Sequence, residues 1–207
     1  QKRYMDLPFA VPDPRFRKKA KEIDGDQGVV KSTADGLAQL KPVVEGGTVT
    51  FGGQTHPADG NAAIVVSGVD RTRELSADST VQIRILSAGQ SRVELAYMPE
   101  APTNAARLAL QHANLSFEDI DVIKTHNPFA VNDIIFARDT GVRVEDFNNF
   151  GCSLIWGHPQ APTAMRSVIE LIEELVMRGG GNGLFTGCAA GDSAMALVLA
   201  VDNRPTG

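Results

Sequence analysis

The sequence has few cysteines, no long apolar run and no excess of basic residues. Its 207 residues include two cysteines, Cys152 and Cys188, which are too few for a disulfide framework and typical of a reducing compartment. The longest apolar runs, such as residues 194–201, fall far short of the roughly 18 residues that span a bilayer. Lys and Arg total 20 against 25 Asp and Glu, for a net charge of −5. Nucleic acid and anionic membranes are therefore poor candidates for partners.

The composition is that of a folded protein. Hydrophobic residues make up 43% of the chain and charged residues 22%, which is too apolar for disorder. Its length corresponds to one large domain or two small ones. The chain opens at Gln1 in a polar, proline-rich stretch without a signal-peptide pattern, as in a chain that begins inside a longer polypeptide or in a processed or engineered one. Together with the cysteine usage, this predicts a cytoplasmic protein.

Helices and strands are expected to alternate along most of the chain. A capping Ser32 or Thr33 predicts a short helix before Pro42. The apolar run over 62–67 suits a strand, or a helix–strand pair, buried on both faces. The alternating pattern over 81–86 predicts a further strand. Other expected strands are 121–124, 183–186 and 194–201, and other expected helices are 102–113, 132–138 and 163–178.

The helix over 163–178 has the clearest pattern. Its apolar residues recur at helical spacing and form one stripe, and Arg178 followed by glycines at 179–181 is typical of a helix end. Helices that alternate with strands in this way predict an α/β fold. In such folds the loops at strand ends commonly carry the functional site.

Three short stretches place reactive side chains in expected loops. His126 follows a strand, His158 lies in a Gly-His-Pro sequence ahead of the long helix, and Cys188 lies in a small-residue turn over 187–192. The helix dipole would favour a neutral imidazole and a nearby anion, and the amides of the turn could face an oxyanion. Taken singly, each residue also has a common structural explanation, such as a surface histidine or a packed cysteine. No CxxC or HxxxH spacing occurs, so we expect no metal site.

The order of these motifs resembles the C-terminal half of thiolases. A Thr-Val-Thr sequence at 48–50 and an Asp-Gly at 59–60 precede His-Asn-Pro-Phe at 126–129, Gly-His-Pro at 157–159 and the cysteine turn. The family patterns are Thr-Ala-Gly-Asn with Asp-Gly, Asn-Glu-Ala-Phe, Gly-His-Pro and Cys-x-Gly-Gly. The resemblance spans roughly residues 40–202. It implies the α/β thiolase fold, five-layered (αβαβα) in the complete enzyme, of which this chain covers mainly the C-terminal half.

The resemblance also implies a role for each matching residue. His158 would activate a nucleophilic thiol and help bind the thioester oxygen. Cys188 would move a proton to or from the α-carbon or the coenzyme A thiol. His126 would hold a water or donate into an oxyanion hole, and the backbone at Ala190 and Gly191 would reach a developing oxyanion. These groups suit cleavage of a 3-oxoacyl thioester. The cysteine that thiolases acylate lies in their N-terminal half and has no match in this chain.

Other residues near the motifs are candidates for the substrate pocket. Phe129, Phe150 and Trp156 could form walls of an aromatic acyl pocket, although core packing explains them as well. Cys152 is expected to line the pocket rather than to act as the nucleophile. The basic cluster over 15–19 is a candidate for binding the phosphates of coenzyme A, which the resemblance implies as a substrate, with no covalently bound cofactor.

Departures from the common pattern resemble one branch of the family. His126 stands where many members have Asn, Asn127-Pro128 replaces Glu-Ala, and the sequence over 53–57 replaces Asn-Ala-Ser-Gly. These features are similar to the sterol-carrier-type thiolases, and among them to benzoylsuccinyl-CoA thiolases of anaerobic toluene breakdown. Members of that branch often work with a small zinc-ribbon/OB-fold subunit. The resemblance therefore implies such a partner as a candidate, together with a homo-oligomer.

The resemblance divides the chain into four parts. Residues 1–47 would belong to the loop region, 48–80 to the last elements of the N-terminal half, 81–202 to the C-terminal domain and 203–207 to a tail. The function it implies is that of a thiolase-type acyl-CoA C-acyltransferase.

Two other functions remain open from the sequence. One is a non-catalytic thiolase-like subunit that binds acyl-CoA and completes a partner's fold, which the missing nucleophile favours and the presence of His158 and Cys188 disfavours. The other is a condensing enzyme similar to hydroxymethylglutaryl-CoA synthase or ketoacyl synthase. Cys188 disfavours this function, because those enzymes typically carry His, or His with Asn, at the matching places.

Overall fold

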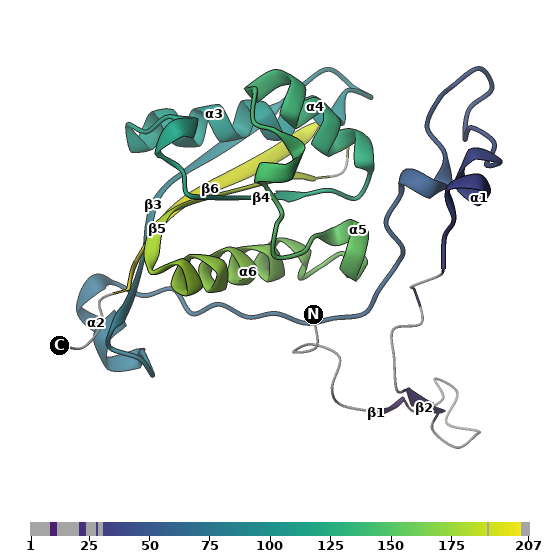
Figure 1. Ribbon diagram of the computed structural model, residues 1–207. Coiled ribbons are helices and arrows are strands. Elements are labelled where there is room, and N and C mark those ends of the chain that lie inside the picture. Colours follow the sequence, from purple (N-terminus) through teal and green to yellow (C-terminus); the bar gives the residue numbers. More distant parts are fainter. Residues whose placement is uncertain (1–8, 12–20, 24–27, 29–30, 190, 204–207) are drawn as a thin grey trace. The chain divides into compact units, whose positions relative to one another are not determined.

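The computed structural model describes residues 9–11, 21–23, 28, 31–189 and 191–203 (Figure 1). The chain divides into two units, residues 1–40 and residues 41–207. Among the described residues, no helix is long and apolar enough to cross a bilayer.

The first unit contains a short hairpin and a short helix. Strand β1 (Phe9–Val11) pairs antiparallel with β2 (Lys21–Ile23), and helix α1 covers Ala34–Ala38. The Thr33 side chain accepts a hydrogen bond from the backbone of Gly36, which confirms Thr33 as the predicted cap. The hairpin was not predicted, because its strands are too short to show an alternating pattern. The basic cluster over 15–19, a candidate for binding phosphates, lies outside the described residues.

The second unit is a mixed α/β sheet with helices on both faces. The strands are β3 (Val81–Arg92), β4 (Val122–His126), β5 (Gly180–Ala189) and β6 (Ser193–Asn203), in the order β3-β6-β5-β4. Strands β4 and β5 are parallel, whereas β6 is antiparallel to both β5 and β3. The longer helices are α3 (Ala101–Ala113), α4 (Ala130–Thr140) and α6 (Thr163–Arg178). This arrangement confirms the predicted α/β class.

Shorter elements connect these strands and helices. The short helices are α2 (Val69–Leu75) and α5 (Ser153–Trp156), and the 3-10 turns are η2 (Phe51–Gly53), η3 (Met98–Glu100), η4 (Phe117–Asp119) and η5 (Val144–Asp146). Turn η4 begins at a capping box in which Ser116 and Asp119 bond reciprocally.

Each face of the sheet has its own apolar core (Figure 1). Helix α3 packs small side chains, Ala105 and Ala109 among them, against one face, together with Phe136 of α4. Helix α6 packs Leu171 and Leu175 against the other face. Both leucines are fully buried, which confirms the apolar stripe predicted for this helix. Because helices cover both faces, functional groups can reach a ligand only at the strand ends and in the loops beside them.

The apolar run over 62–67 was predicted wrongly. The structure has no helix or strand over 61–68, and the side chains of Val65 and Val66 are 80% and 70% exposed. An apolar run forms a buried strand only when a neighbouring strand pairs with it. In the described part of the chain no strand does so.

Candidate active site

His126 and Cys188 meet because β4 and β5 are parallel neighbours. His126 is the last residue of β4 and lies in register with Gly187 of β5. The Sγ atom of Cys188 is 3.8 Å from Nδ1 of His126, although the two residues are 62 apart in the chain. A Cβ atom at Gly187 would come within 2.9 Å of the His126 Cβ atom, so a larger residue there would push the imidazole away. Cys188 lies within β5, because that strand runs on through Ala189 and the predicted turn is correspondingly shorter.

His158 reaches the same place from the loop between α5 and α6. It follows Gly157, which ends α5 with a φ of +84° that a glycine adopts without strain. The backbone N–H of His158 donates to the His56 carbonyl at 2.9 Å. The rings of His126 and His158 lie 4.6 Å apart between centroids. The structure therefore brings together the three residues that the sequence predicted to be catalytic, and their roles remain a prediction.

A hydrogen-bond chain sets the orientation of the His158 ring. Its Nδ1 atom lies 2.8 Å from the hydroxyl of Thr163, and that hydroxyl donates to the Pro159 carbonyl at 2.6 Å. Because the hydroxyl hydrogen is already used, the Thr163 oxygen accepts from the Nδ1–H of His158. This leaves Nε2 as the basic nitrogen. Thr163 begins α6 and is fully buried, so the long helix holds the base in place.

Burial keeps both histidines neutral. Burial, together with the nearby His158 and Arg166, lowers the pKa of His126 to about 4. Burial and Arg166 also lower the pKa of His158. The pKa of Cys188 is raised by burial, and a backbone hydrogen bond and Asn132 oppose that rise. The site at neutral pH therefore contains two neutral imidazoles and a protonated thiol. The helix dipole expected to favour a thiolate is outweighed by the burial of the sulfur.

We expect the stability of the folded protein to fall as the pH is lowered from about 6.5 towards 4. In this range unfolded His126 binds a proton that folded His126 does not, so acid favours the unfolded state. At about 1.4 kcal/mol per pKa unit, the predicted loss between pH 7.5 and pH 5 is about 2 kcal/mol. Denaturant titrations at the two pH values measure it. The His126→Asn variant should lose this part of the pH dependence, and an equally steep dependence in the variant would exclude His126 as its source.

A network of polar side chains fastens the His126 turn to the segment before His158. The Asn127 amide donates to Asp133 at 2.6 Å, and its oxygen accepts from the backbone N–H of Ser153 at 3.0 Å. Thr125 also donates to Asp133, at 2.6 Å. Ser153 opens α5, so this network links the two loops that carry the histidines. Asp133 and Ser153 were missed from sequence because no motif contains them.

A buried group of charges makes a second link. The Lys124 ammonium lies 3.1 Å from Glu170 and donates to the Gly151 carbonyl at 2.5 Å. Both side chains are almost fully buried. Arg166 pairs with Glu170 at 3.4 Å and donates to the Gly157 carbonyl at 3.2 Å. Strand β4, helix α6 and the loop over 151–157 are thereby held together beside the site.

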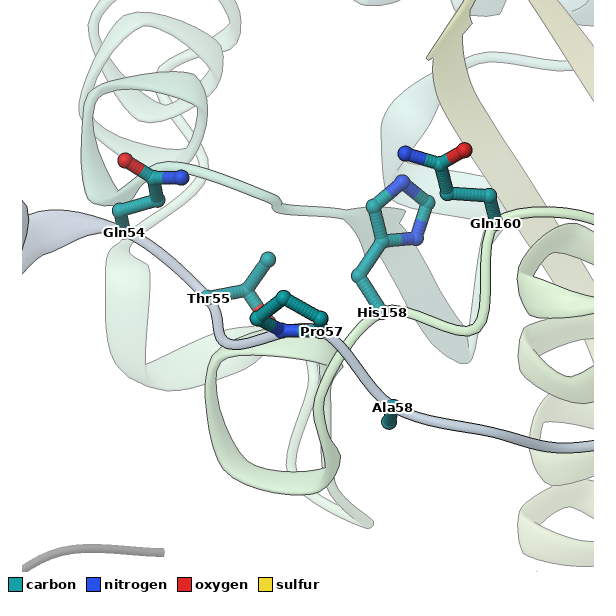
Figure 2. Close-up of a pocket in the computed structure, with 6 residues that line it drawn as sticks. All are labelled: Gln54, Thr55, Pro57, Ala58, His158 and Gln160. Atoms are coloured by element: carbon teal, nitrogen blue, oxygen red, sulfur yellow. The ribbon is translucent and has the colours of Figure 1, made fainter. Parts of the chain in front are cut away.

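A pocket of about 360 Å³ opens beside His158 (Figure 2). Figure 2 shows the imidazole standing between the segment that carries Gln54 and the side chain of Gln160. Thr55 fixes this segment, since its N–H donates to the Pro128 carbonyl at 2.8 Å. The residues that line the pocket are Gln54, Thr55, Pro57, Ala58, His158 and Gln160. The glycine- and proline-rich segment 53–57 thus forms one wall of a cavity that has the candidate base on the other.

The remaining predicted residues surround the site at a greater distance. Phe129 precedes α4 and Cys152 precedes α5, and both are half-buried. The indole of Trp156 packs against Gly151. The six residues that line the pocket in Figure 2 include none of these three, so their contact with a substrate remains a prediction. Gly191 lies in the β5–β6 turn with a φ of +94°, and Ala190 lies outside the described residues.

Comparison with protein families decides the family. The model for "Thiolase, C-terminal domain" matches residues 79–201, which is more than half of the chain. The chain belongs to the thiolase family. Among curated relatives of this thiolase chain, an acetyl-CoA acetyltransferase of Syntrophomonas wolfei is 32% identical over 180 residues, covering 86% of this chain and 45% of the relative. A 3-ketoacyl-CoA thiolase of Aeromonas salmonicida is 36% identical over 185 residues, covering 80% and 42%.

Solved thiolase structures have the same fold. The Bacillus anthracis acetyl-CoA acetyltransferase superposes with a TM-score of 0.81 at 27% identity, covering 94% of this chain and 49% of that one. Human mitochondrial 3-ketoacyl-CoA thiolase superposes with a TM-score of 0.80 at 25% identity, covering 93% and 48%. These likenesses confirm that the chain covers the C-terminal half of the thiolase fold. The chain spans about half the length of the curated relatives it matches.

Proposed function

We propose that this chain supplies the acid–base half of a thiolase, an acyl-CoA C-acyltransferase that cleaves or forms 3-oxoacyl-CoA. The observation that carries the proposal is the meeting of His158, which lines the pocket, with His126 and Cys188. A neutral imidazole can accept a proton and a thiol can donate one, and both are needed to break and remake the bond next to a thioester. The names of the relatives, acetyl-CoA acetyltransferase and 3-ketoacyl-CoA thiolase, agree with this chemistry.

The first half of the reaction would use His158 as the base. A nucleophilic cysteine, expected on an N-terminal part of the protein or on a partner chain, attacks the 3-oxo carbonyl as His158 Nε2 takes its proton. The carbon–carbon bond then breaks. The acyl group stays on the nucleophilic sulfur, and the electron pair moves to the α-carbon of the departing acyl-CoA as an enolate.

Cys188 would complete both halves of the reaction. Its S–H gives a proton to the α-carbon of the enolate and becomes a thiolate. The thiolate then takes a proton from the thiol of an incoming coenzyme A, whose sulfur attacks the acyl-cysteine and releases the new acyl-CoA. Cys188 returns to its protonated state, and the proton on His158 returns to the nucleophilic cysteine.

His126 would stabilise the developing oxyanion. Its Nδ1 atom faces the Cys188 sulfur and can accept from the S–H, which leaves the hydrogen on Nε2. In the described part of the chain the Nε2 atom is buried and has no hydrogen-bond partner. It is thus available to donate to a thioester oxygen, together with backbone amides near Ala190 and Gly191.

The substrate class and partners follow the sterol-carrier-type branch. His126, Asn127 and Pro128 support this branch, and within it we propose an aromatic acyl group such as that of benzoylsuccinyl-CoA, with Phe129, Cys152 and Trp156 near the acyl chain. A small zinc-ribbon/OB-fold subunit and a second copy of the chain are the proposed partners, in the cytoplasm. The proposed division is 48–80 in the N-terminal half and 81–202 in the C-terminal domain.

The alternative is a non-catalytic subunit that binds acyl-CoA and completes a partner's fold. It is favoured by the absence of a match for the nucleophile, since Cys188 matches the family's second cysteine and Cys152 matches neither.

Intact mass and thiolysis of the purified complete protein, with every chain that copurifies, separate the two functions. The proposed thiolase should cleave a 3-oxoacyl-CoA only when coenzyme A is added. Incubation without coenzyme A should leave an acyl group on a cysteine outside residues 1–207. Tight binding of acyl-CoA with neither cleavage nor an acyl-cysteine would establish the non-catalytic subunit instead.

A further inference from the structure

Asn132 lies beside the Cys188 sulfur in the first turn of α4. Its Nδ2 atom is 3.8 Å from Sγ, the same distance that separates Sγ from Nδ1 of His126. The Asn132 side chain is 3% exposed. The sulfur thus has an amide donor and an imidazole among its polar neighbours. No sequence motif marked Asn132, because the contact joins residues 56 apart in the chain.

Most of the hydrogen-bonding capacity of the Asn132 side chain is unused. In the described part of the chain its one side-chain hydrogen bond goes to Cys188, and its Oδ1 atom is buried without a partner. A buried amide left half-satisfied costs stability, so an apolar residue of similar size would serve a purely structural position better. The thiol is therefore the contact that accounts for an amide at this position.

The two neighbouring asparagines are used differently. Asn127 uses both ends of its amide, with Asp133 and Ser153. Asn148 also uses both ends, and both bonds go to Thr125. These two residues hold loops together, and each does so through both the oxygen and the nitrogen of its amide. Among the described residues, Asn132 bonds only through its nitrogen, to the Cys188 sulfur, and its oxygen has no partner, which distinguishes its role from theirs.

We infer that Asn132 is a positioning residue that stabilises the thiolate of Cys188 by donating its amide N–H to the sulfur. This rests on the proposed function, in which the thiolate exists between protonation of the enolate and deprotonation of coenzyme A. A buried thiolate without a donor is strongly disfavoured, and a hydrogen bond to the charged form lowers that penalty. Asn132 thereby helps Cys188 to give up its proton in a site where burial of the sulfur favours the protonated thiol.

Two variants of Asn132 test this in the complete protein. Leucine removes the donor at similar volume, and aspartate keeps the shape but places a negative charge beside the sulfur. The rate of iodoacetamide alkylation of the Cys188 peptide is followed against pH by mass spectrometry. We expect the apparent pKa of Cys188 to rise by about one unit in N132L, which is a roughly tenfold slower reaction at a fixed pH below that value. The rise should be larger in N132D.

Two controls separate this role from a structural one. Cys152 is alkylated in the same sample, and its rate should be the same in all variants. The N182L variant removes an asparagine from the opposite end of β5 and should leave the Cys188 profile unchanged. An unchanged Cys188 pKa in both Asn132 variants would overturn the inference, and so would parallel changes at Cys152 and Cys188.

The readout does not depend on turnover. If the complete protein lacks thiolysis but the pKa shift is found, the proposed function fails and the contact of Asn132 with the thiolate stands. In an active protein, N132L should lower kcat for thiolysis while leaving the KM for the 3-oxoacyl-CoA unchanged. The amide touches the sulfur rather than the bound acyl chain, so substrate affinity should not depend on it.

Discussion

Replacing His158 by alanine should reduce thiolysis by the complete protein by a factor of about 10²–10⁴, the usual contribution of a positioned general base. The variant removes the free Nε2 atom that would accept the proton of the nucleophilic thiol. Folding should be little changed, because the ring is half-buried and its hydrogen-bond partner Thr163 keeps its own bond to Pro159. The kcat/KM for a 3-oxoacyl-CoA measures the effect.

A second histidine provides the matched control for this experiment. His112 lies on α3, is exposed and contacts the Ala88 carbonyl, away from the three residues of the candidate site. H112A should retain the activity of the unchanged protein. Equal activity in H158A and H112A would show that His158 does not act as the general base. Loss of the melting transition in H158A alone would show that its side chain is needed for folding instead.

Replacing Lys124 by methionine should lower the free energy of unfolding by about 3–5 kcal/mol, because it leaves the buried Glu170 carboxylate without its nearest cation. The same change removes the donor to the Gly151 carbonyl. Arg166 remains beside Glu170 at 3.4 Å and limits the loss towards the lower value. Denaturant unfolding of the complete protein measures the difference.

A double variant and an exposed ion pair make this test specific. K124M/E170M removes both charges of this pair and should recover part of the stability that K124M loses, since no carboxylate is then left buried without its nearest cation. The recovery is incomplete because Arg166 loses Glu170 as its partner. Arg84 and Asp202 form a pair on β3 and β6 whose side chains are 54% and 41% exposed, so R84M should cost less than about 1 kcal/mol. A loss in K124M no larger than that in R84M would contradict the interpretation of the buried pair.

The elements predicted best are those whose own residues determine them. Helix α6 has the predicted bounds because its apolar stripe and glycine end are local signals. The strands β5 and β6 are longer than predicted, since small and polar residues at their ends pair only through a neighbouring strand. The run over 62–67 was predicted as a buried element because apolar residues alone cannot say whether a partner strand exists.

In the candidate site, too, the residues that stand in local motifs were predicted, and those that depend on a distant partner were not. His126, His158 and Cys188 stand in motifs whose order is visible along the chain, and the structure brings the three together. Lys124 and Asn132 were not predicted, because each acts through a partner far away in sequence. A lysine within an apolar strand pattern gives no sign of the carboxylate that neutralises it. Such pairings exist only once strands and helices have taken their places.

The parallel pairing of β4 with β5 also has a consequence for how the molecule folds. Parallel strands cannot be joined by a tight turn, so the chain between the end of β4 at His126 and the start of β5 at Gly180 must first run through α4, α5 and α6. Contacts that close such long loops form late and slowly. Most of the helical content can therefore be present in a newly made chain before His126 and Cys188 are adjacent. The contact between His126 and Cys188 therefore forms only when the sheet closes, and its recovery during refolding would report that final event.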